Sequence, residues 1–172
     1  HLIKKINFIL FLLSTALLST GVFSKENKIE YSRNNVANYF SGIVSSNQDY
    51  TTRAFKYLNK VKLLKNRHNN FNIQFIQTLI LLEKFEEAFD FSKDVSVEDE
   101  YFFEADLLLG LQSFLKEDYV KAEKYFEKLN NVSIHDLNFK NFLGNVLISW
   151  SKAAQNNEAS SLEYFKKIPD RY

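Results

Sequence analysis

Apolar side chains recur every third or fourth residue along most of the chain, and short polar stretches separate the segments that follow this pattern. This spacing places the apolar side chains on one face of an α-helix. In the clearest pair of segments the positions on that face are Phe103, Leu107, Gly110, Leu111 and Phe114, followed by Tyr119, Ala122, Tyr125, Phe126 and Leu129. The chain has one proline and four glycines, so it predicts helices joined by short polar turns.

A fixed period relates these two segments to the rest of the chain. Ala54, Ala88 and Ala122 follow one another at equal intervals, and the same interval leads from Gly110 to Gly144. Its length, about 34 residues, is typical of stacked helical hairpins. We expect the first helices of the hairpins near residues 34–47, 68–82, 98–115 and 134–155, and the second helices near 50–64, 84–94, 118–130 and 157–168.

The third unit carries the fullest motif, with Leu109-Gly110 followed by Ala122-x3-Phe126. In these residues the chain resembles the tetratricopeptide repeat family, whose unit of about 34 residues reads W-x2-L-G-x2-Y, then A-x3-F, then P. The resemblance covers Asn34 to Pro169. It implies an all-α fold in which about four hairpins stack in a right-handed superhelical solenoid. The expected units are 34–67, 68–97, 98–133 and 134–168, after a signal peptide over 1–24 and a linker over 25–33.

The other units depart from the family pattern at named positions. Ile76 stands where the second unit should have its glycine. Phe165 follows Phe126 after an interval longer than the period, which predicts a turn about five residues longer in the fourth unit. No unit has the tryptophan of the family, because its place is taken by Asn38, Asp106 and Lys140.

Small residues mark where the two helices of a hairpin approach closely, and we expect Gly110 and Ala122 to form that crossing in the third unit. A glycine inside a helix costs about 1 kcal/mol against alanine, and close packing would offset this cost. The positions expected to pack the helices are Gly42, Ala54, Ala88, Leu109, Gly110, Ala122, Phe126 and Gly144. We also expect Ser96 with Asp99 to begin the third unit, and Asp118 to cap its second helix.

The resemblance implies a concave surface lined by the first helices, at the places three before, one after and four after the glycine. The main candidates for this surface are Tyr39, Ile43, Ile73, Gln77, Leu107, Leu111, Phe114, Asn138, Asn141 and Asn145. The same counting also gives Ser46, Ile80 and Ile148. The asparagines could hydrogen-bond the backbone of an extended peptide, or could be solvated surface residues. The apolar stripe could bind a ligand or belong to the core. No lysine or arginine occupies these places, so we expect no carboxylate clamp.

The N-terminus has the organisation of a secretory signal. Lys4 and Lys5 precede an apolar run from Phe8 to Leu18, and Val22 and Ser24 are spaced as a cleavage site requires. We expect export to the periplasm or cell envelope with cleavage after Ser24, and no membrane insertion afterwards. The alternative is an uncleaved anchor helix, because the uncharged stretch is barely long enough to span a bilayer.

Composition favours binding over catalysis. The formal net charge is +1, and it becomes about −1 when 20 basic and 21 acidic residues remain after removal of the signal, so we expect no nucleic-acid partner. There is no cysteine, and the histidines have no partners at ligand spacing, so we expect no metal, no cofactor and no catalytic residue.

These observations predict a non-catalytic scaffold of the cell envelope that binds a protein or peptide through the concave face of a helical array. One alternative is the N-terminal recognition arm of a larger exported enzyme or envelope assembly factor. The start at His1 and the end directly after the fourth unit favour a fragment of a longer protein. A weaker alternative is a structural module that self-associates.

Overall fold

The structure is a computed structural model that describes residues 32–66, 68–96, 101–130 and 137–168. The expected signal peptide and most of the expected linker lie outside these residues. The described part contains eight α-helices, one 3-10 helix and no strand, so the predicted all-α class is confirmed. The elements are α2 Arg33–Asn47, α3 Thr51–Leu58, η1 Asn59–Asn66, α4 Asn69–Leu81, α5 Phe85–Val95, α6 Phe103–Leu115, α7 Tyr119–Leu129, α8 Leu137–Ala154 and α9 Glu158–Phe165.

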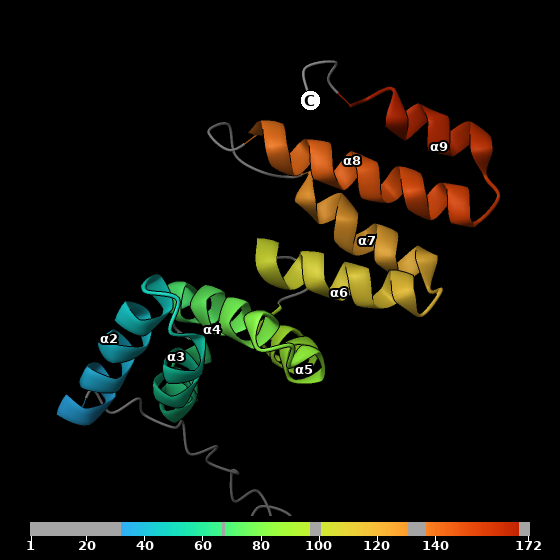
Figure 1. Cartoon of the computed structure of the whole chain (residues 1–172). Coiled ribbons are helices and arrows are strands. Elements are labelled where there is room, and N and C mark those ends of the chain that lie inside the picture. Colours follow the sequence, from blue (N-terminus) through green and yellow to red (C-terminus); the bar gives the residue numbers. More distant parts are fainter. Residues whose placement is uncertain (1–31, 67, 97–100, 131–136, 169–172) are drawn as a thin grey trace, which may run out of the picture.

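Consecutive helices pair into four antiparallel hairpins, which stack in chain order from α2 and α3 at one end to α8 and α9 at the other (Figure 1). Each helix packs mainly on its neighbours in the sequence. A hairpin cannot bury its own apolar face completely, so stacking of successive hairpins provides the continuous core of such a solenoid.

The same turn closes all four hairpins. Asp49, Glu83, Glu117 and Asn156 each have a positive φ, between 58° and 62°. In the third hairpin the N–H of Asp118 donates to the carbonyl of Ser113 at 3.0 Å, and the other hairpins repeat this bond. This is the Schellman arrangement, which satisfies the last carbonyls of a helix. The first three left-handed residues recur at the period of the sequence and the fourth follows a longer interval, so they fix the register of every unit.

The structure corrects two predicted helix boundaries. Ser96 ends α5 in an extended conformation, and α6 begins only at Phe103, so Ser96 does not cap the first helix of the third hairpin. Asp99 lies outside the described residues. Asp106 instead accepts a hydrogen bond from the N–H of Phe102 at 2.9 Å, which satisfies one free donor at the start of α6. The second helix of the first hairpin does not run to residue 64 as an α-helix, because it becomes 3-10 with a kink at Val61.

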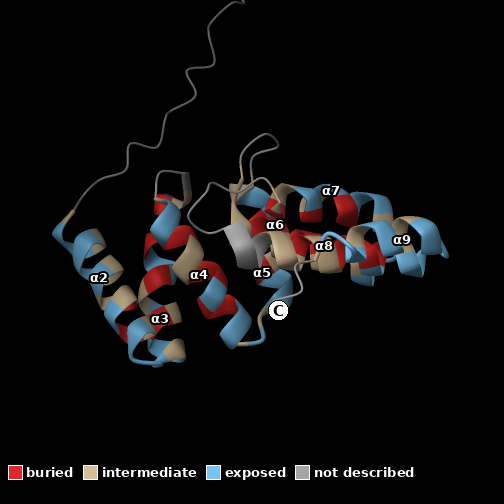
Figure 2. Ribbon diagram, turned by 90° about the horizontal axis from the view of Figure 1, so that it is seen from above, coloured by how far each residue is buried: buried red, intermediate tan, exposed pale blue. Residues whose placement is uncertain are grey.

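Two apolar clusters fill the array. The buried positions, red in Figure 2, lie mainly on the helices between α2 and α9. The first joins the first two hairpins to the start of α6, and stacked or edge-on phenylalanines lie at its centre: the rings of Phe71 and Phe75 are 5.5 Å apart, and those of Phe75 and Phe91 are 4.8 Å apart. The second joins α7 to α8 through Phe126 and Leu147. The third hairpin therefore contributes to both clusters and links the two halves of the molecule.

The helices of a hairpin cross where a small residue faces a large one. A Cβ added to Gly110 would lie 2.7 Å from Cδ1 of Phe126, and one added to Gly42 would lie 2.7 Å from Cγ of Leu58. Neither distance leaves room for a side chain. Gly110 therefore packs against Phe126, four residues beyond the expected partner Ala122. Ala122 is itself fully buried.

Candidate protein-binding surface

The turn register changes the assignment of the fourth hairpin. Gly110 lies seven positions before the left-handed Glu117, and the position seven before the left-handed Asn156 is Ser149. Ser149 bonds the backbone oxygen of Ser161 at 2.9 Å, across the same sequence interval that separates Gly110 from Ala122. The expectation that Gly144 takes the glycine place is therefore wrong.

Gly144 faces the preceding hairpin instead. A Cβ on it would lie 3.1 Å from the backbone oxygen of Phe126 and 3.1 Å from Cγ of Asn130, at the end of α7. The expected longer turn is also wrong, because α8 has 18 residues where α6 has 13. The additional residues thus lie in the first helix of the unit and not in its turn.

The corrected register moves the groove places of the fourth hairpin to Val146, Trp150 and Ala153. Asn145 leaves the groove set: its Oδ1 accepts a hydrogen bond from Nδ2 of Asn130 at 3.3 Å. Ile148 is fully buried in the second cluster, so it cannot line an open surface.

Of the other two asparagine candidates, only Asn141 has a described side chain. Asn141 is half-buried, and its Oδ1 has no hydrogen-bond partner among the described residues. The side chain of Asn138 lies outside the described residues.

The groove candidates of the first three hairpins combine packing with partial exposure. Tyr39 accepts a hydrogen bond from Nδ2 of Asn70 at 3.1 Å, and both Tyr39 and Ile43 pack on the first cluster. In the second hairpin Ile73 is half-buried and Gln77 is exposed. In the third, the half-buried candidates Leu107, Leu111 and Phe114 pack on the second cluster. These last three side chains therefore support the core and border the surface at the same time.

None of the twelve groove places in the corrected register carries a charge, although 25% of the residues in the chain are charged. The twelve are Tyr39, Ile43, Ser46, Ile73, Gln77, Ile80, Leu107, Leu111, Phe114, Val146, Trp150 and Ala153. Trp150 is the one tryptophan of the chain, and 60% of its surface is exposed. The sequence motif did not predict Trp150 as a groove residue. Leu143-Gly144 matches the motif five residues before Ser149, which takes the glycine place in the structure.

Polar residues occupy the tryptophan place of the family in every hairpin once the register is corrected. They are Asn38, Asn72, Asp106 and Asn145. Asn72 is buried and donates to the carbonyl of Lys65 at 2.9 Å. Asp106 is fully buried, and one of its oxygens lies 3.5 Å from Nζ of Lys128.

Burial raises the pKa of Asp106 above its ordinary value, and the hydrogen bond from Phe102 and the charge of Lys128 only partly oppose this. The pKa of Tyr125 is also raised, first by burial and then by the nearby carboxylate of Asp106. Both residues belong to the third hairpin, and neither occupies a groove place.

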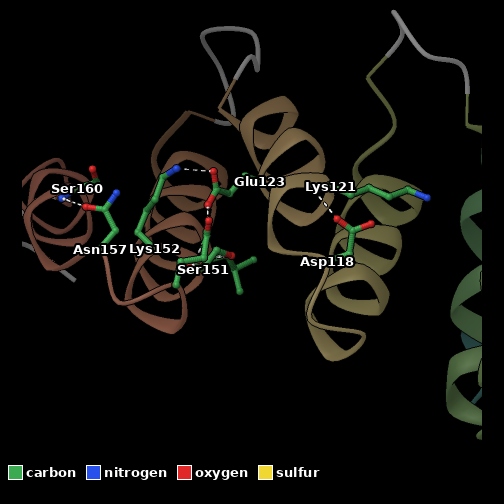
Figure 3. A network of polar contacts seen from close by, with 9 residues as sticks. Asp118, Lys121, Glu123, Ser151, Lys152, Asn157 and Ser160 are labelled. Atoms are coloured by element: carbon green, nitrogen blue, oxygen red, sulfur yellow. Dashed lines mark hydrogen bonds and ion pairs between the residues drawn. The ribbon is translucent and has the colours of Figure 1, made fainter.

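An ionic network joins α7 to α8 (Figure 3). Glu123 accepts from Nζ of Lys152 at 2.6 Å and from Nε2 of Gln155, which also donates to the carbonyl of Ser151 at 2.9 Å. Asp118 and Asn157 cap α7 and α9, since their side chains accept from the N–H groups of Lys121 and Ser160. The expected cap at Asp118 is confirmed.

A separate pocket of about 570 Å³ lies between α5 and α7. Its lining includes four lysines, namely Lys93, Lys121, Lys124 and Lys128. Lys93 pairs with Asp90 and Lys128 with Asp106, so part of this positive charge is neutralised within the protein.

Within the described ranges, no group of three or more His, Cys, Asp or Glu side chains comes together as a metal site would require. Across the same residues no helix has the length and apolar character needed to cross a bilayer.

No protein-family model matches the chain, and no curated protein matches it. Among solved structures, one described as "MamA RS-1 ArsTM double mutant" superimposes with a TM-score of 0.59 at 20% sequence identity. The match covers 80% of this chain and 75% of that one. MamA contains tetratricopeptide repeats. The fold is a tetratricopeptide-type solenoid. The tetratricopeptide-type fold agrees with the motif in the third hairpin and with the regular spacing of the first three left-handed residues.

Proposed function

We propose that this chain is a non-catalytic scaffold that binds an uncharged, largely apolar segment of a partner protein along its first helices. The supporting observation is the absence of charge from all twelve groove places, together with the exposed indole of Trp150. Exposed tryptophan is a common centre of binding energy in protein interfaces. A surface of this composition favours apolar contacts and gives no counter-charge for an acidic peptide terminus.

Trp150 offers a direct assay because it is the only tryptophan in the chain. We would titrate the protein with a panel of extended peptides, half apolar and uncharged and half with acidic C-termini, and follow the tryptophan emission. Apolar peptides should shift the emission to shorter wavelength as the indole leaves water, whereas acidic peptides should not.

A labelled peptide measured by anisotropy supplies the control. Trp150→Ala should weaken its binding at least about tenfold, which corresponds to about 1.4 kcal/mol. Phe85→Ala should leave binding unchanged, because Phe85 is also an exposed aromatic residue, 47% exposed, but begins a second helix. Equal responses to both peptide classes, or none to either, would contradict the proposed surface.

We propose further that the scaffold works in the cell envelope after export. The support is the sequence of residues 1–24, with its basic start, apolar run and small residues before Lys25. Mass spectrometry of the protein from fractionated cells should give an N-terminus at Lys25 in the envelope fraction. An intact N-terminus there would favour an anchor instead.

A further inference from the structure

Two pockets lie at equivalent places in the repeat, each beside the second helix of a hairpin. The η1–α5 pocket has a volume of about 420 Å³, and the α5–α7 pocket is the one of about 570 Å³ described above. The period of the left-handed residues relates Phe91, which lines the η1–α5 pocket, to Tyr125, which lines the α5–α7 pocket. The charges of the two pockets can therefore be compared place by place.

The acidic residues of the η1–α5 pocket are all paired. Three acids of α5 and two lysines of η1 line this pocket. Lys65 of η1 bonds Asp94 of α5 at 2.7 Å and so joins the two walls. The other two acids, Glu87 and Asp90, each pair with a lysine three residues away. At this place in the fold the protein thus supplies its own counter-charges.

The α5–α7 pocket carries the opposite charge at the same places. The three acids of α5 correspond to three lysines of α7, namely Lys121, Lys124 and Lys128. The wall on α5 adds a fourth lysine, Lys93. The one acid in the described lining is Asp118, whose carboxylate already accepts the N–H of Lys121 as the cap of α7. Lysines therefore face one another across this pocket, whereas acids face lysines in the η1–α5 pocket.

Two of these four lysines are available to a ligand. Lys121 and Lys124 are exposed, and neither has an ion-pair partner among the residues that the structure describes. In Figure 3 the side chain of Lys121 extends away from Glu123 and its partners on α8. The pair between Lys93 and Asp90 is exposed on both sides, and such pairs contribute little. An anion in the pocket would therefore relieve the repulsion among the lysines.

We propose that the α5–α7 pocket binds a small organic ligand through a terminal phosphate group. A phosphate of this kind carries nearly two negative charges, and lysine binds it as a compact point charge. Carboxylates are recognised best by the forked donors of arginine, and the described lining has none. The volume of the pocket suits a small organic molecule, and Leu109, Val120 and Tyr125 offer apolar surface to its remainder. This site lies beside the second helices, so it is independent of the groove on the first helices.

The test is isothermal titration calorimetry of the full chain with adenosine diphosphate, and adenosine is the matched probe without phosphate. Adenosine diphosphate should bind, with an affinity that falls as salt is added, and adenosine should not. Vesicles of phosphatidylcholine with and without phosphatidic acid test the lipid source of the same group. Binding to adenosine diphosphate alone assigns a soluble ligand, and binding only to vesicles with phosphatidic acid assigns a lipid headgroup. Binding to neither phosphate probe would overturn the proposal.

Two variants install the residues of the η1–α5 pocket at the equivalent places. Lys121→Glu and Lys124→Asp should each weaken binding of the phosphate probe at least about tenfold, which corresponds to about 1.4 kcal/mol. The matched control is Lys56→Asp, because Lys56 is exposed and takes the place of Lys124 on α3 but lines neither pocket. It should leave binding unchanged, and circular dichroism checks that all three variants fold. An equal loss in the control would overturn the proposal, because it would indicate a general effect of net charge.

Two further measurements exclude other occupants of the pocket. A glutamate oligomer that binds more tightly than adenosine diphosphate would assign the pocket to an acidic protein segment and overturn the proposal. The sequence also has Glu98, Asp99 and Glu100 shortly after Ser96. If the phosphate probe binds only to the combined variant Glu98→Gln, Asp99→Asn and Glu100→Gln, acids of the chain itself compete for the lysines and the proposal is wrong. Peptide binding in the groove should be the same in Lys121→Glu as in the wild type, so the two sites can fail separately.

Discussion

At the crossing of the second hairpin, α4 carries Ile76 and α5 carries Ser92, whereas α6 carries Gly110 and α7 carries Phe126 in the third. All four positions are buried, and the members of the two pairs are equally far apart in the sequence. The second hairpin places its large residue on the first helix and its small one on the second, and the third hairpin does the reverse. The combined volume at a crossing therefore matters more than the glycine that marks it in the family motif.

The same two hairpins differ in polarity. Phenylalanines fill the core of the second, whereas the third buries Asp106 beside Lys128 and Glu123 beside Lys152. A buried ion pair is only weak support for stability, because desolvation opposes the attraction between its charges. We therefore expect the third hairpin to respond to pH and the second to respond mainly to changes of volume.

The largest expected effect comes from exchanging the volumes at the crossing. Gly110→Ile should destabilise by about 1–3 kcal/mol through overpacking, and Phe126→Ser by about 3–5 kcal/mol through the cavity it leaves. The double variant places an isoleucine opposite a serine, as in the second hairpin, and should recover part of the loss. Urea unfolding monitored by circular dichroism measures all three.

The converse variants, Ile76→Gly with Ser92→Phe, test whether the exchange is symmetric. Their coupling free energy in a double-mutant cycle should be favourable and about 0.5–3 kcal/mol. If the changes in unfolding free energy are strictly additive in both hairpins, the paired residues do not pack in the same space. The reversed sizes at the two crossings would then have no common physical cause.

A smaller effect should follow from the buried carboxyl of the third hairpin. Since the folded pKa of Asp106 is raised above its ordinary value of 3.8, the stability it contributes is fully present at low pH and is lost as pH rises through the folded pKa. Asp106→Asn removes this loss and still accepts the hydrogen bond from Phe102. The difference in free energy of unfolding between variant and wild type should therefore grow as pH increases above 3.8.

Asn72 occupies the equivalent place in the second hairpin and supplies the control. Asn72→Asp should introduce a pH-dependent loss where none exists, because the new carboxylate would replace an amide that donates to Lys65. Parallel pH profiles for wild type and Asp106→Asn would show that the carboxyl is not desolvated as its burial implies.

The caps of the second helices should give an effect of about 1 kcal/mol. Asp118 accepts the N–H of Lys121, whereas Lys84 at the equivalent place makes no side-chain cap. Asp118→Ala should therefore lower the free energy of unfolding by about 1 kcal/mol. Lys84→Asp should raise it by less, because the substitution also removes the ion pair with Glu87. Thermal unfolding of both variants measures the difference, and equal losses at both positions would remove capping as the cause.

The sequence alone predicted those features of the two hairpins that depend on the repeat period. The equal intervals between alanines and the apolar face of each helix predicted the hairpins and the cap at Asp118. It failed where a local motif competed with the turn. Leu143-Gly144 looked like the motif of the third unit, yet the left-handed Asn156 sets the register of the fourth. Asparagine adopts this conformation more readily than most residues, but this preference is a weaker signal than a glycine motif.

The groove was predicted less well for the same physical reason. Each groove place is counted from the crossing residue, so one misplaced glycine put Asn145 in the place that belongs to Trp150, and Ile148 in the place that belongs to Ala153. The exchange of volumes at Ile76 and Ser92 was also hidden, because it requires knowing which residue of α5 lies opposite α4. The structure provides the spacing of the left-handed residues. This spacing identifies both the groove places of the fourth hairpin and the paired positions Ile76 and Ser92.

The smallest expected effect tests the turn that the two hairpins share. Glu83 and Glu117 hold φ near +60°, where a side chain is strained and glycine is not. Glu83→Gly and Glu117→Gly should each stabilise by a few tenths to about 1 kcal/mol, since relief of strain exceeds the greater freedom of glycine in the unfolded chain. Glu127→Gly, inside α7, should instead destabilise by about 1 kcal/mol. The two turn variants should agree with each other despite the different cores beside them, because the turn is closed by backbone bonds alone. The same urea unfolding measures both variants. If one variant is stabilised and the other destabilised, the packing of each core affects its turn. The left-handed residues would then not define the repeat register independently of the core.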